Sequence, residues 1–278
     1  MELVRPGSVE EAVAQLVNGA VPLAGGTEVV PLTRDGILDP STLVDIRGVV
    51  PRGHANGRIG AGTTLAELEA DGEIPVVLRE ACRLAASPQL RNMGTIGGNL
   101  LQATRCWYWR LHQPCRLHGG DACLAASGEH REHAILGNDF CASAHPSDPA
   151  AALLALGATV HTDRRALPIA DLYRLPTAAD RNVTTLEPDE LILELELPAA
   201  EASVYLKAMD RQRWAFALVG VAAVRSGGAT RLALAGVAPV PWLLDRPESL
   251  DAATPLPRNA YKVELARALV ARAVAAVA

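Results

Sequence analysis

Four of the five cysteines of this chain lie within residues 105–142, a stretch that shows no clean helical or strand periodicity. Their order and spacing are Cys106-x8-Cys115-x7-Cys123-x17-Cys141. Reduced thiols gathered in this way favour a soft metal over a disulfide framework. The segment directly follows a glycine-rich stretch of the kind that lets backbone approach a phosphate, and this combination points to electron transfer.

The first residues, the longest apolar stretch and the net charge indicate the cellular location of the protein and the ligands it does not bind. Residues 1–6 show no basic region followed by an apolar run, so no secretory signal is expected. The longest apolar stretch, residues 149–160, is too short to span a bilayer. A formal net charge of −5 excludes nonspecific nucleic-acid binding, which needs a basic surface. We expect a cytoplasmic protein without a membrane span, in which thiols stay reduced.

The rest of the chain carries mixed helix and strand patterns. With 278 residues, 49% of them hydrophobic, it can bury a substantial core. The patterns predict helices over 8–18, 27–36, 64–70, 75–86, 149–156 and 262–277, and strands over 21–24, 43–45, 58–61, 158–162, 191–197, 217–224 and 231–237. The pattern changes after Leu167-Pro168. We therefore expect two domains, residues 1–166 and 167–278.

Two glycine-rich turns are candidate phosphate sites. Leu23-Ala24-Gly25-Gly26-Thr27-Glu28 joins a strand to a helix, and Gly94-Thr95-Ile96-Gly97-Gly98-Asn99 follows a helix. Without Cβ atoms, such turns let backbone amides point at a diphosphate. Neither matches the Rossmann or P-loop pattern, and either alone is most simply a tight turn.

Taken in order, these motifs resemble the FAD-binding subunit of the molybdenum hydroxylases, a family that includes xanthine dehydrogenase, carbon monoxide dehydrogenase and 4-hydroxybenzoyl-CoA reductase. The resemblance covers nearly the whole chain. It rests on the two turns together with Gly60-Ala61-Gly62-Thr63-Thr64, Pro146-Ser147-Asp148, Pro188-Asp189-Glu190-Leu191-Ile192, Tyr205-Leu206-Lys207 with Arg211, and Gly236-Val237-Ala238-Pro239.

The resemblance implies an α+β fold, with a two-lobed FAD-binding domain of the vanillyl-alcohol-oxidase type followed by a smaller α+β C-terminal domain. It also implies the cofactor contacts. The FAD diphosphate and ribityl chain are expected at Ala24, Gly25, Gly26, Thr27, Glu28, Val29, Thr95, Gly98 and Asn99. Asp148 is expected to bond a cofactor hydroxyl, Ile192 to lie against the flavin ring, and Lys207 to lie near its polar edge.

Each of these last three residues also has a plain structural interpretation. Asp148 can cap the helix that begins at Pro149, Ile192 can pack in a core, and Lys207 can be solvated. The chain also departs from the family at Ala215, where relatives often carry an acidic residue. That departure indicates a different flavin environment or different access to it.

The cysteine segment resembles an insertion that carries a [4Fe–4S] cluster in 4-hydroxybenzoyl-CoA reductase and in some aldehyde-oxidising relatives. The resemblance implies Cys106, Cys115, Cys123 and Cys141 as its ligands. Zinc is the alternative, because four thiolates, or two thiolates and two imidazoles, also satisfy a tetrahedral site. Candidate imidazoles are His112, His118, His130, His133 and His145. Cys82 lies in a helical apolar pattern and is expected in the core.

We therefore expect an electron-transfer flavoprotein subunit, an FAD-dependent oxidoreductase that passes electrons between a [2Fe–2S] partner, FAD and a [4Fe–4S] cluster. The resemblance implies a molybdopterin-binding large subunit and a [2Fe–2S] small subunit as partners. No residue of this chain is assigned to substrate chemistry. Two alternatives stay open: a stand-alone FAD and iron–sulfur oxidoreductase acting on a small metabolite, and a zinc-stabilised binding protein without catalysis.

Overall fold

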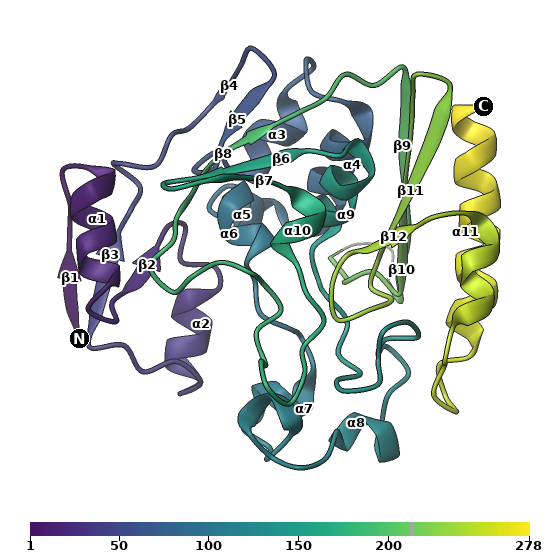
Figure 1. Cartoon of the computed structure of the whole chain (residues 1–278), viewed down its shortest axis with the longest axis horizontal. Coiled ribbons are helices and arrows are strands. Elements are labelled where there is room, and N and C mark those ends of the chain that lie inside the picture. The colour runs from purple at the N-terminus through teal and green to yellow at the C-terminus, as the bar shows by residue number, and fades with distance from the viewer. Residues whose placement is uncertain (212–213) are drawn as a thin grey trace.

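The structure, a computed structural model, describes residues 1–211 and 214–278 (Figure 1). The described residues form three separate sheets with helices packed between and around them. Helices and strands are mixed along the chain, so the α+β class expected from the sequence is confirmed.

A small parallel sheet and two helices form the N-terminal lobe. Its strand order is β1-β3-β2, and Ser8 accepts a hydrogen bond from the Glu11 amide at the start of α1, as the capping pattern predicts. The turn after β2 leads directly into α2. The bounds are β1 (Glu2–Val4), α1 (Val9–Leu16), β2 (Val21–Leu23), α2 (Val29–Arg34) and β3 (Thr42–Asp45).

The second sheet has five antiparallel strands in the order β4-β5-β8-β6-β7. Strand β8 comes last in sequence but pairs between β5 and β6, so the domain boundary expected between residues 166 and 167 falls inside this sheet. The strands are β4 (His54–Ala55), β5 (Arg58–Gly60), β6 (Thr159–Thr162), β7 (Ala166–Pro168) and β8 (Ile192–Glu196). The helices beside it are α3 (Leu65–Ala70), α4 (Val76–Ala85), α5 (Pro88–Arg91), α6 (Ile96–Leu100) and α10 (Ile169–Leu172).

The C-terminal sheet is antiparallel, in the order β12-β11-β10-β9. Helix α11 covers one face of this sheet, and α4 and α9 cover the other (Figure 1). Strand β10 is buried along most of its length because helices lie on both sides of it. The bounds are β9 (Ala202–Ala208), β10 (Val219–Ser226), β11 (Ala229–Ala235), β12 (Trp242–Leu244), the short turn of helix η2 (Pro247–Ala252) and α11 (Tyr261–Val277).

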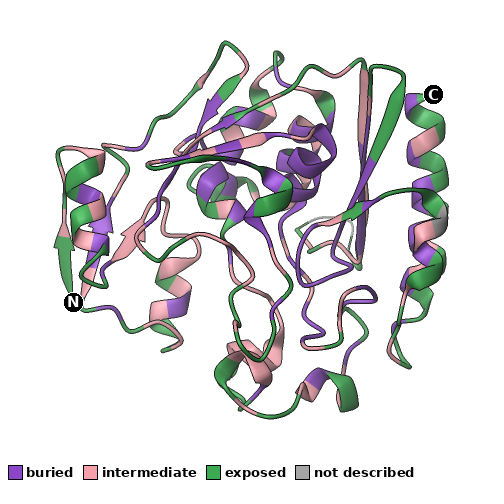
Figure 2. Cartoon of the chain, viewed as in Figure 1, coloured by how far each residue is buried: buried purple, intermediate pink, exposed green. Residues whose placement is uncertain are grey.

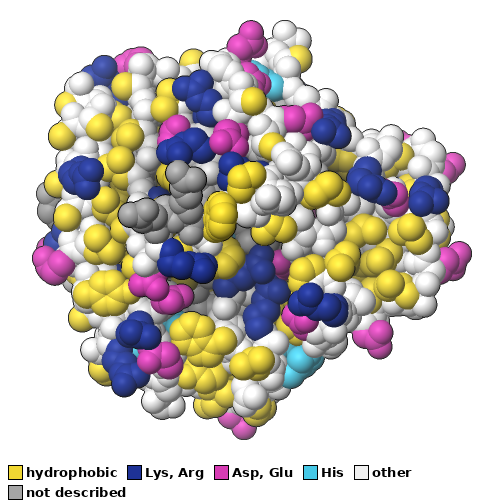
Figure 3. All heavy atoms as spheres, turned by 180° about the vertical axis from the view of Figure 1, so that it is seen from behind, with side chains coloured by type: hydrophobic (Ala, Val, Ile, Leu, Met, Phe, Trp, Pro, Cys, Tyr) yellow, Lys and Arg dark blue, Asp and Glu magenta, His cyan; other side chains and the backbone are white. Residues whose placement is uncertain are grey.

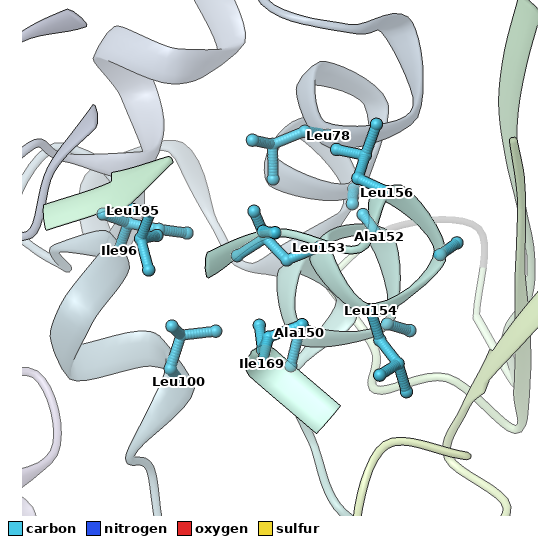
Figure 4. Packing of buried hydrophobic residues seen from close by; sticks show 14 of the residues in the cluster. Leu78, Ile96, Leu100, Ala150, Ala152, Leu153, Leu154, Leu156, Ile169 and Leu195 are labelled. Carbon is cyan, nitrogen blue, oxygen red and sulfur yellow. The ribbon is translucent and has the colours of Figure 1, made fainter. Parts of the chain in front are cut away.

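Helix α9 (Asp148–Leu156) forms the centre of the core, and every one of its residues is buried (Figure 2). A helix that is apolar on all sides is stable only when it is surrounded by protein. Figure 4 shows its side chains among Leu78 of α4, Leu100 of α6 and Leu195 of β8. Through α9, the second sheet, the C-terminal sheet and the glycine-rich α6 share one core.

The cysteine segment lies outside these layers, at the bottom of Figure 1. Its only regular elements are single turns: α7 (Trp107–Arg110), η1 (Arg116–His118) and α8 (Leu124–Ser127). Most of the residues in these turns are half-buried or exposed (Figure 2). Ile135 and Leu136, further along the segment, are buried in a hydrophobic cluster with residues of β10 and β11, so apolar packing holds that part in place and contributes little at the turns.

Candidate functional site

A cavity of about 820 Å³ lies between the N-terminal lobe and the rest of the molecule. Both glycine turns line it, and so do Ile192 of β8 and the aromatic side chains of Trp214 and Phe216. The two aromatic residues are largely exposed, and Trp214 adopts a positive φ of 57°. The cavity lining therefore combines amide-rich turns with apolar side chains.

The first glycine turn is shaped by its contact with the second. A Cβ on Gly25 would lie 1.7 Å from the Met93 carbonyl oxygen, so only glycine allows the two segments to approach. Gly26 has a φ of 73°, which favours glycine at that position also. Of the residues expected at the diphosphate, all six in this turn line the cavity: Ala24, Gly25, Gly26, Thr27, Glu28 and Val29.

The second turn is held by a side-chain cap and by the neighbouring Gly60–Thr64 segment. The buried Thr95 hydroxyl accepts a hydrogen bond from the Gly98 amide at 3.2 Å. A Cβ on Gly97 would lie 2.9 Å from Ala61 Cβ, which explains why glycine is required there. Thr95, Gly98 and Asn99 line the cavity, and Asn99 also accepts from the Ser147 hydroxyl at 2.6 Å.

Basic side chains line this cavity as well. Arg47, Arg52 and Arg105 all reach its surface, and each is paired with a carboxylate. Figure 3 shows Lys and Arg side chains gathered in the hollowed middle of the face opposite to that of Figure 1. Guanidinium groups and backbone amides together suit an anionic group such as a diphosphate.

Glu28 and Arg105 connect the cavity to the cysteine segment. The Glu28 carboxylate accepts from Arg105 Nη2 at 2.7 Å, from Arg110 Nη2 at 2.5 Å and from the Ala103 amide at 3.1 Å. Glu28 also lines the cavity, and its contact with a cofactor stays a prediction. Arg105 also lies over the Phe216 ring at 5.2 Å. No local sequence pattern predicts this bridge, because Glu28 and its partners are at least 75 residues apart.

Asp148 and Lys207 were expected at the cofactor but do not line the cavity. Their charged groups lie 2.7 Å apart and are almost fully buried. Asp148 also accepts from the Tyr205 hydroxyl, and Lys207 also donates to the Leu84 carbonyl at 2.8 Å. Burial raises the pKa of Asp148, and Lys207 and Tyr205 oppose that rise. The interpretation of Lys207 as a solvated side chain is therefore wrong. The interpretation of Asp148 as the helix cap is also wrong, because Ser147 is the N-cap of α9. A direct contact of either residue with a cofactor stays a prediction.

Ile192 and Ala215, which were expected in the flavin environment, both line this cavity, and their contact with a flavin stays a prediction. Ile192 is 5% exposed, and it lines the cavity while also belonging to the main core. Ala215 lines the cavity between Trp214 and Phe216. An apolar wall of this kind fits a flat aromatic ring, and the small Ala215 side chain leaves that wall without a charge.

The four cysteines of the segment line one small cavity, although they come from different turns. Cys115 and Cys141 are buried, and Cys106 and Cys123 are half-buried. Burial raises the pKa of Cys106, and it raises that of Cys141 to about 11. Burial therefore favours the protonated thiol in the absence of a nearby positive charge.

The spacing of the four sulfurs bears on the kind of metal. In the described part of the chain, no three of them lie within 4.8 Å of one another. His133 Nε2 lies 3.3 Å from Cys106 Sγ. Cys82 lies apart from them, fully buried in α4, as expected for a core residue. The binding of a metal by these cysteines stays a prediction.

Comparison with known proteins decides the family. Residues 1–200 match the family described as the FAD binding domain in molybdopterin dehydrogenase. The chain belongs to this family. Both glycine turns, the cysteine segment and Ile192 lie inside the matched region. The molybdopterin dehydrogenase membership confirms the resemblance found in the sequence, and it makes the chain the FAD-binding subunit of an oxidoreductase of the molybdenum hydroxylase type.

Individual relatives agree with this assignment. The chain is 36% identical to the aldehyde oxidoreductase FAD-binding subunit PaoB of Escherichia coli, over 94% of this chain and 92% of the relative. It is 30% identical to the carbon monoxide dehydrogenase medium chain of Hydrogenophaga pseudoflava, over 84% and 74%. A solved carbon monoxide dehydrogenase structure from that organism superposes with a TM-score of 0.72 at 26% identity, covering 100% of this chain and 96% of the other.

These findings confirm FAD as a cofactor of the family to which the chain belongs. They also confirm the FAD-binding fold expected from the resemblance. None of the helices in the described residues has the length and apolar character needed to cross a membrane.

Proposed function

We propose that this subunit transfers electrons between a [2Fe–2S] partner subunit, its own FAD, and a [4Fe–4S] cluster held by Cys106, Cys115, Cys123 and Cys141. One observation carries the proposal. Cys106 lines the cysteine cavity, and Arg105, the residue before it, lines the FAD cavity. The two candidate cofactor sites are thus separated along the chain by a single peptide bond.

The glycine turns support the binding of FAD in a defined orientation. They place backbone amides and the Thr27 and Thr95 hydroxyls in the cavity lining, where these groups, together with the nearby guanidinium groups, suit a diphosphate. Ile192 supplies an apolar surface for the flavin ring on the other side. When bound, FAD supplies one- and two-electron chemistry, and an iron–sulfur cluster supplies one-electron chemistry. The chain itself positions the two groups.

The sulfur geometry favours an iron–sulfur cluster over zinc. A tetrahedral zinc site with bonds of about 2.3 Å holds its sulfurs only about 3.8 Å apart. Here no three cysteine sulfurs in the described residues approach within 4.8 Å. A four-iron cube bound at its corners keeps its ligands farther apart than one metal ion does. Four sulfurs that line one shared cavity, with no three of them so close together in the described residues, therefore suit such a cluster better than a single zinc ion.

The ion pairs of Glu28 support communication between the two sites. Glu28 ends the first glycine turn, and its carboxylate binds arginines on both sides of Cys106. A shift of the cysteine segment would therefore displace the first glycine turn, which contains Glu28. We propose that this bridge keeps the cluster and the flavin at a fixed separation, as efficient electron exchange requires.

The partner subunits are proposed from the relatives. The names of the relatives describe an FAD-binding subunit and medium chains, which are parts of larger enzymes. We propose a molybdopterin-binding large subunit, on which substrate would react, and a [2Fe–2S] small subunit that exchanges electrons with FAD. Trp214 and Phe216, exposed at the cavity mouth, are apolar groups that such a partner would cover.

Anaerobic purification followed by assays for FAD, iron, acid-labile sulfide and zinc tests the proposal. We expect about one FAD, about four irons and about four sulfides for each chain. About one zinc for each chain, without sulfide, would instead show that the cysteine segment holds a structural zinc site. FAD with neither metal would leave a flavoprotein without the proposed second centre.

A further inference from the structure

His133 lies between the cysteine cavity and a second, separate cavity. Its Nε2 atom is 3.3 Å from Cys106 Sγ, and the residue is 3% exposed. The ring meets the Trp107 ring edge-on, with centroids 4.8 Å apart and planes at 83°. Packing on one side and the sulfur on the other leave the imidazole little freedom to turn.

The backbone of His133 is held as firmly as its ring. Its carbonyl accepts from Asn259 Nδ2 at 3.1 Å and from Lys262 Nζ at 2.9 Å. Asn259 and Lys262 are both fully buried. Lys262 donates its other hydrogen bonds to the carbonyls of Glu132 and Gly236. The start of α11 and the end of β11 therefore hold His133 against the cysteine segment.

The chemistry of a metal-bound thiolate decides where the imidazole proton lies. Such a sulfur has lone pairs and no proton, so it can only accept a hydrogen bond. The proton must then reside on Nε2. The other nitrogen, Nδ1, has no hydrogen-bond partner among the described residues, and His133 lines a cavity of about 350 Å³ that adjoins the FAD cavity. Nδ1 can thus accept from water while Nε2 donates to sulfur.

We infer that His133 donates an N–H···S hydrogen bond to Cys106 and thereby raises the reduction potential of the cluster. The inference rests on the proposed [4Fe–4S] cluster. Reduction adds negative charge that spreads onto the sulfurs, and a hydrogen bond to sulfur stabilises it. In the described residues, Cys106 Sγ also accepts from the backbone amides of Tyr108 and Trp109, and Cys141 Sγ accepts from the Ser143 amide and donates to the Ser143 hydroxyl. His133 is thus a positioning residue that acts through Cys106.

A potentiometric titration monitored by EPR tests this inference. His133→Phe keeps a ring against Trp107 and removes the donor, whereas His133→Gln keeps an N–H donor. We expect a more negative cluster midpoint in His133→Phe, a value nearer the wild type in His133→Gln, and an unchanged FAD midpoint in both. His118→Phe is the control, because His118 stacks on Trp109 and faces no sulfur. A wild-type midpoint in His133→Phe that retains its iron and sulfide would overturn the inference.

If His133→Phe loses the cluster, pulsed EPR of the reduced wild-type protein labelled with ¹⁵N-histidine decides the question. A hydrogen-bonded imidazole gives a weak nitrogen coupling. No coupling, or the strong coupling of a directly bound nitrogen, would overturn the inference. A wild-type protein without iron and sulfide would contradict the proposed function itself, and this outcome is distinct from a failure of the inference about His133.

Discussion

Glu28 and Arg105 form an ion pair, at 2.7 Å, between the turn that begins the FAD cavity and the residue that precedes Cys106. Both side chains are mostly shielded from water, so screening weakens the pair little. The first glycine turn and the start of the cysteine segment are therefore coupled through one carboxylate.

Glu28→Gln should weaken both sites. The substitution keeps the size of the side chain but removes the charge that Arg105 and Arg110 share. We expect lower FAD and iron content and a free energy of unfolding reduced by about 1–3 kcal/mol. Glu264→Gln, which disrupts an exposed pair with Arg267, serves as the control and should change neither. Wild-type cofactor content and stability in Glu28→Gln would show that the bridge is dispensable.

Gly98→Val should give folded protein without FAD. Gly98 is exposed at the cavity surface, and an added side chain would occupy the space in which backbone amides approach a diphosphate. Gly26→Val should do the same, with additional strain from its positive φ. Absorbance of bound flavin measures the result. The matched control is Gly72→Val, since nothing lies within 4 Å of that position. Normal flavin content in Gly98→Val would refute the assignment of the turn.

Lys207→Met should destabilise the fold, because it leaves the Asp148 carboxylate buried without its cation. Removing one partner of a buried pair costs about 3–5 kcal/mol, measurable by denaturant unfolding. Asp148→Asn in the same chain should recover part of this loss. The flavin midpoint potential of the single variant adds a second test. A more negative value would support the expected proximity of Lys207 to the flavin, and an unchanged value would leave it a structural residue.

His145 should make the protein less stable in mild acid. Burial lowers its pKa from 6.5 to about 4, so between these pH values the unfolded chain binds a proton that the folded chain does not. Stability is therefore lost as pH falls through this window. Between pH 7 and pH 5 this residue should account for about 2 kcal/mol of lost unfolding free energy. His145→Gln should show a loss smaller by that amount in urea titrations, and an equal loss in both proteins would contradict the assignment.

Local signals in the sequence were enough for most helices and for the glycine turns. The Ser8 cap and the apolar run of α9 each determine their element within a few residues, and the structure agrees with them. Gly25 and Gly26 were recognisable in the sequence because a side chain at Gly25 would clash with Met93 and the positive φ of Gly26 favours glycine. These features depend on near neighbours, which is why sequence patterns detect them.

Long-range pairing was not predictable from local patterns. Strand β8 inserts between β5 and β6, so a boundary drawn where the pattern changed fell inside a sheet. The buried pair of Lys207 and Asp148 likewise depends on packing between distant elements. His133 was one of five candidate histidines, and only the fold distinguishes the one that faces a sulfur.

The most direct test of the central claim is the iron and sulfide content of Cys141→Ser beside that of Cys82→Ser, both prepared without oxygen. Cys141 lines the shared cavity, whereas Cys82 is in the core, so only the first substitution should remove the cluster. We predict little iron and sulfide with FAD retained in Cys141→Ser, and about four of each in Cys82→Ser. Equal iron and sulfide in the two variants, or zinc without sulfide in the wild type, would contradict the account.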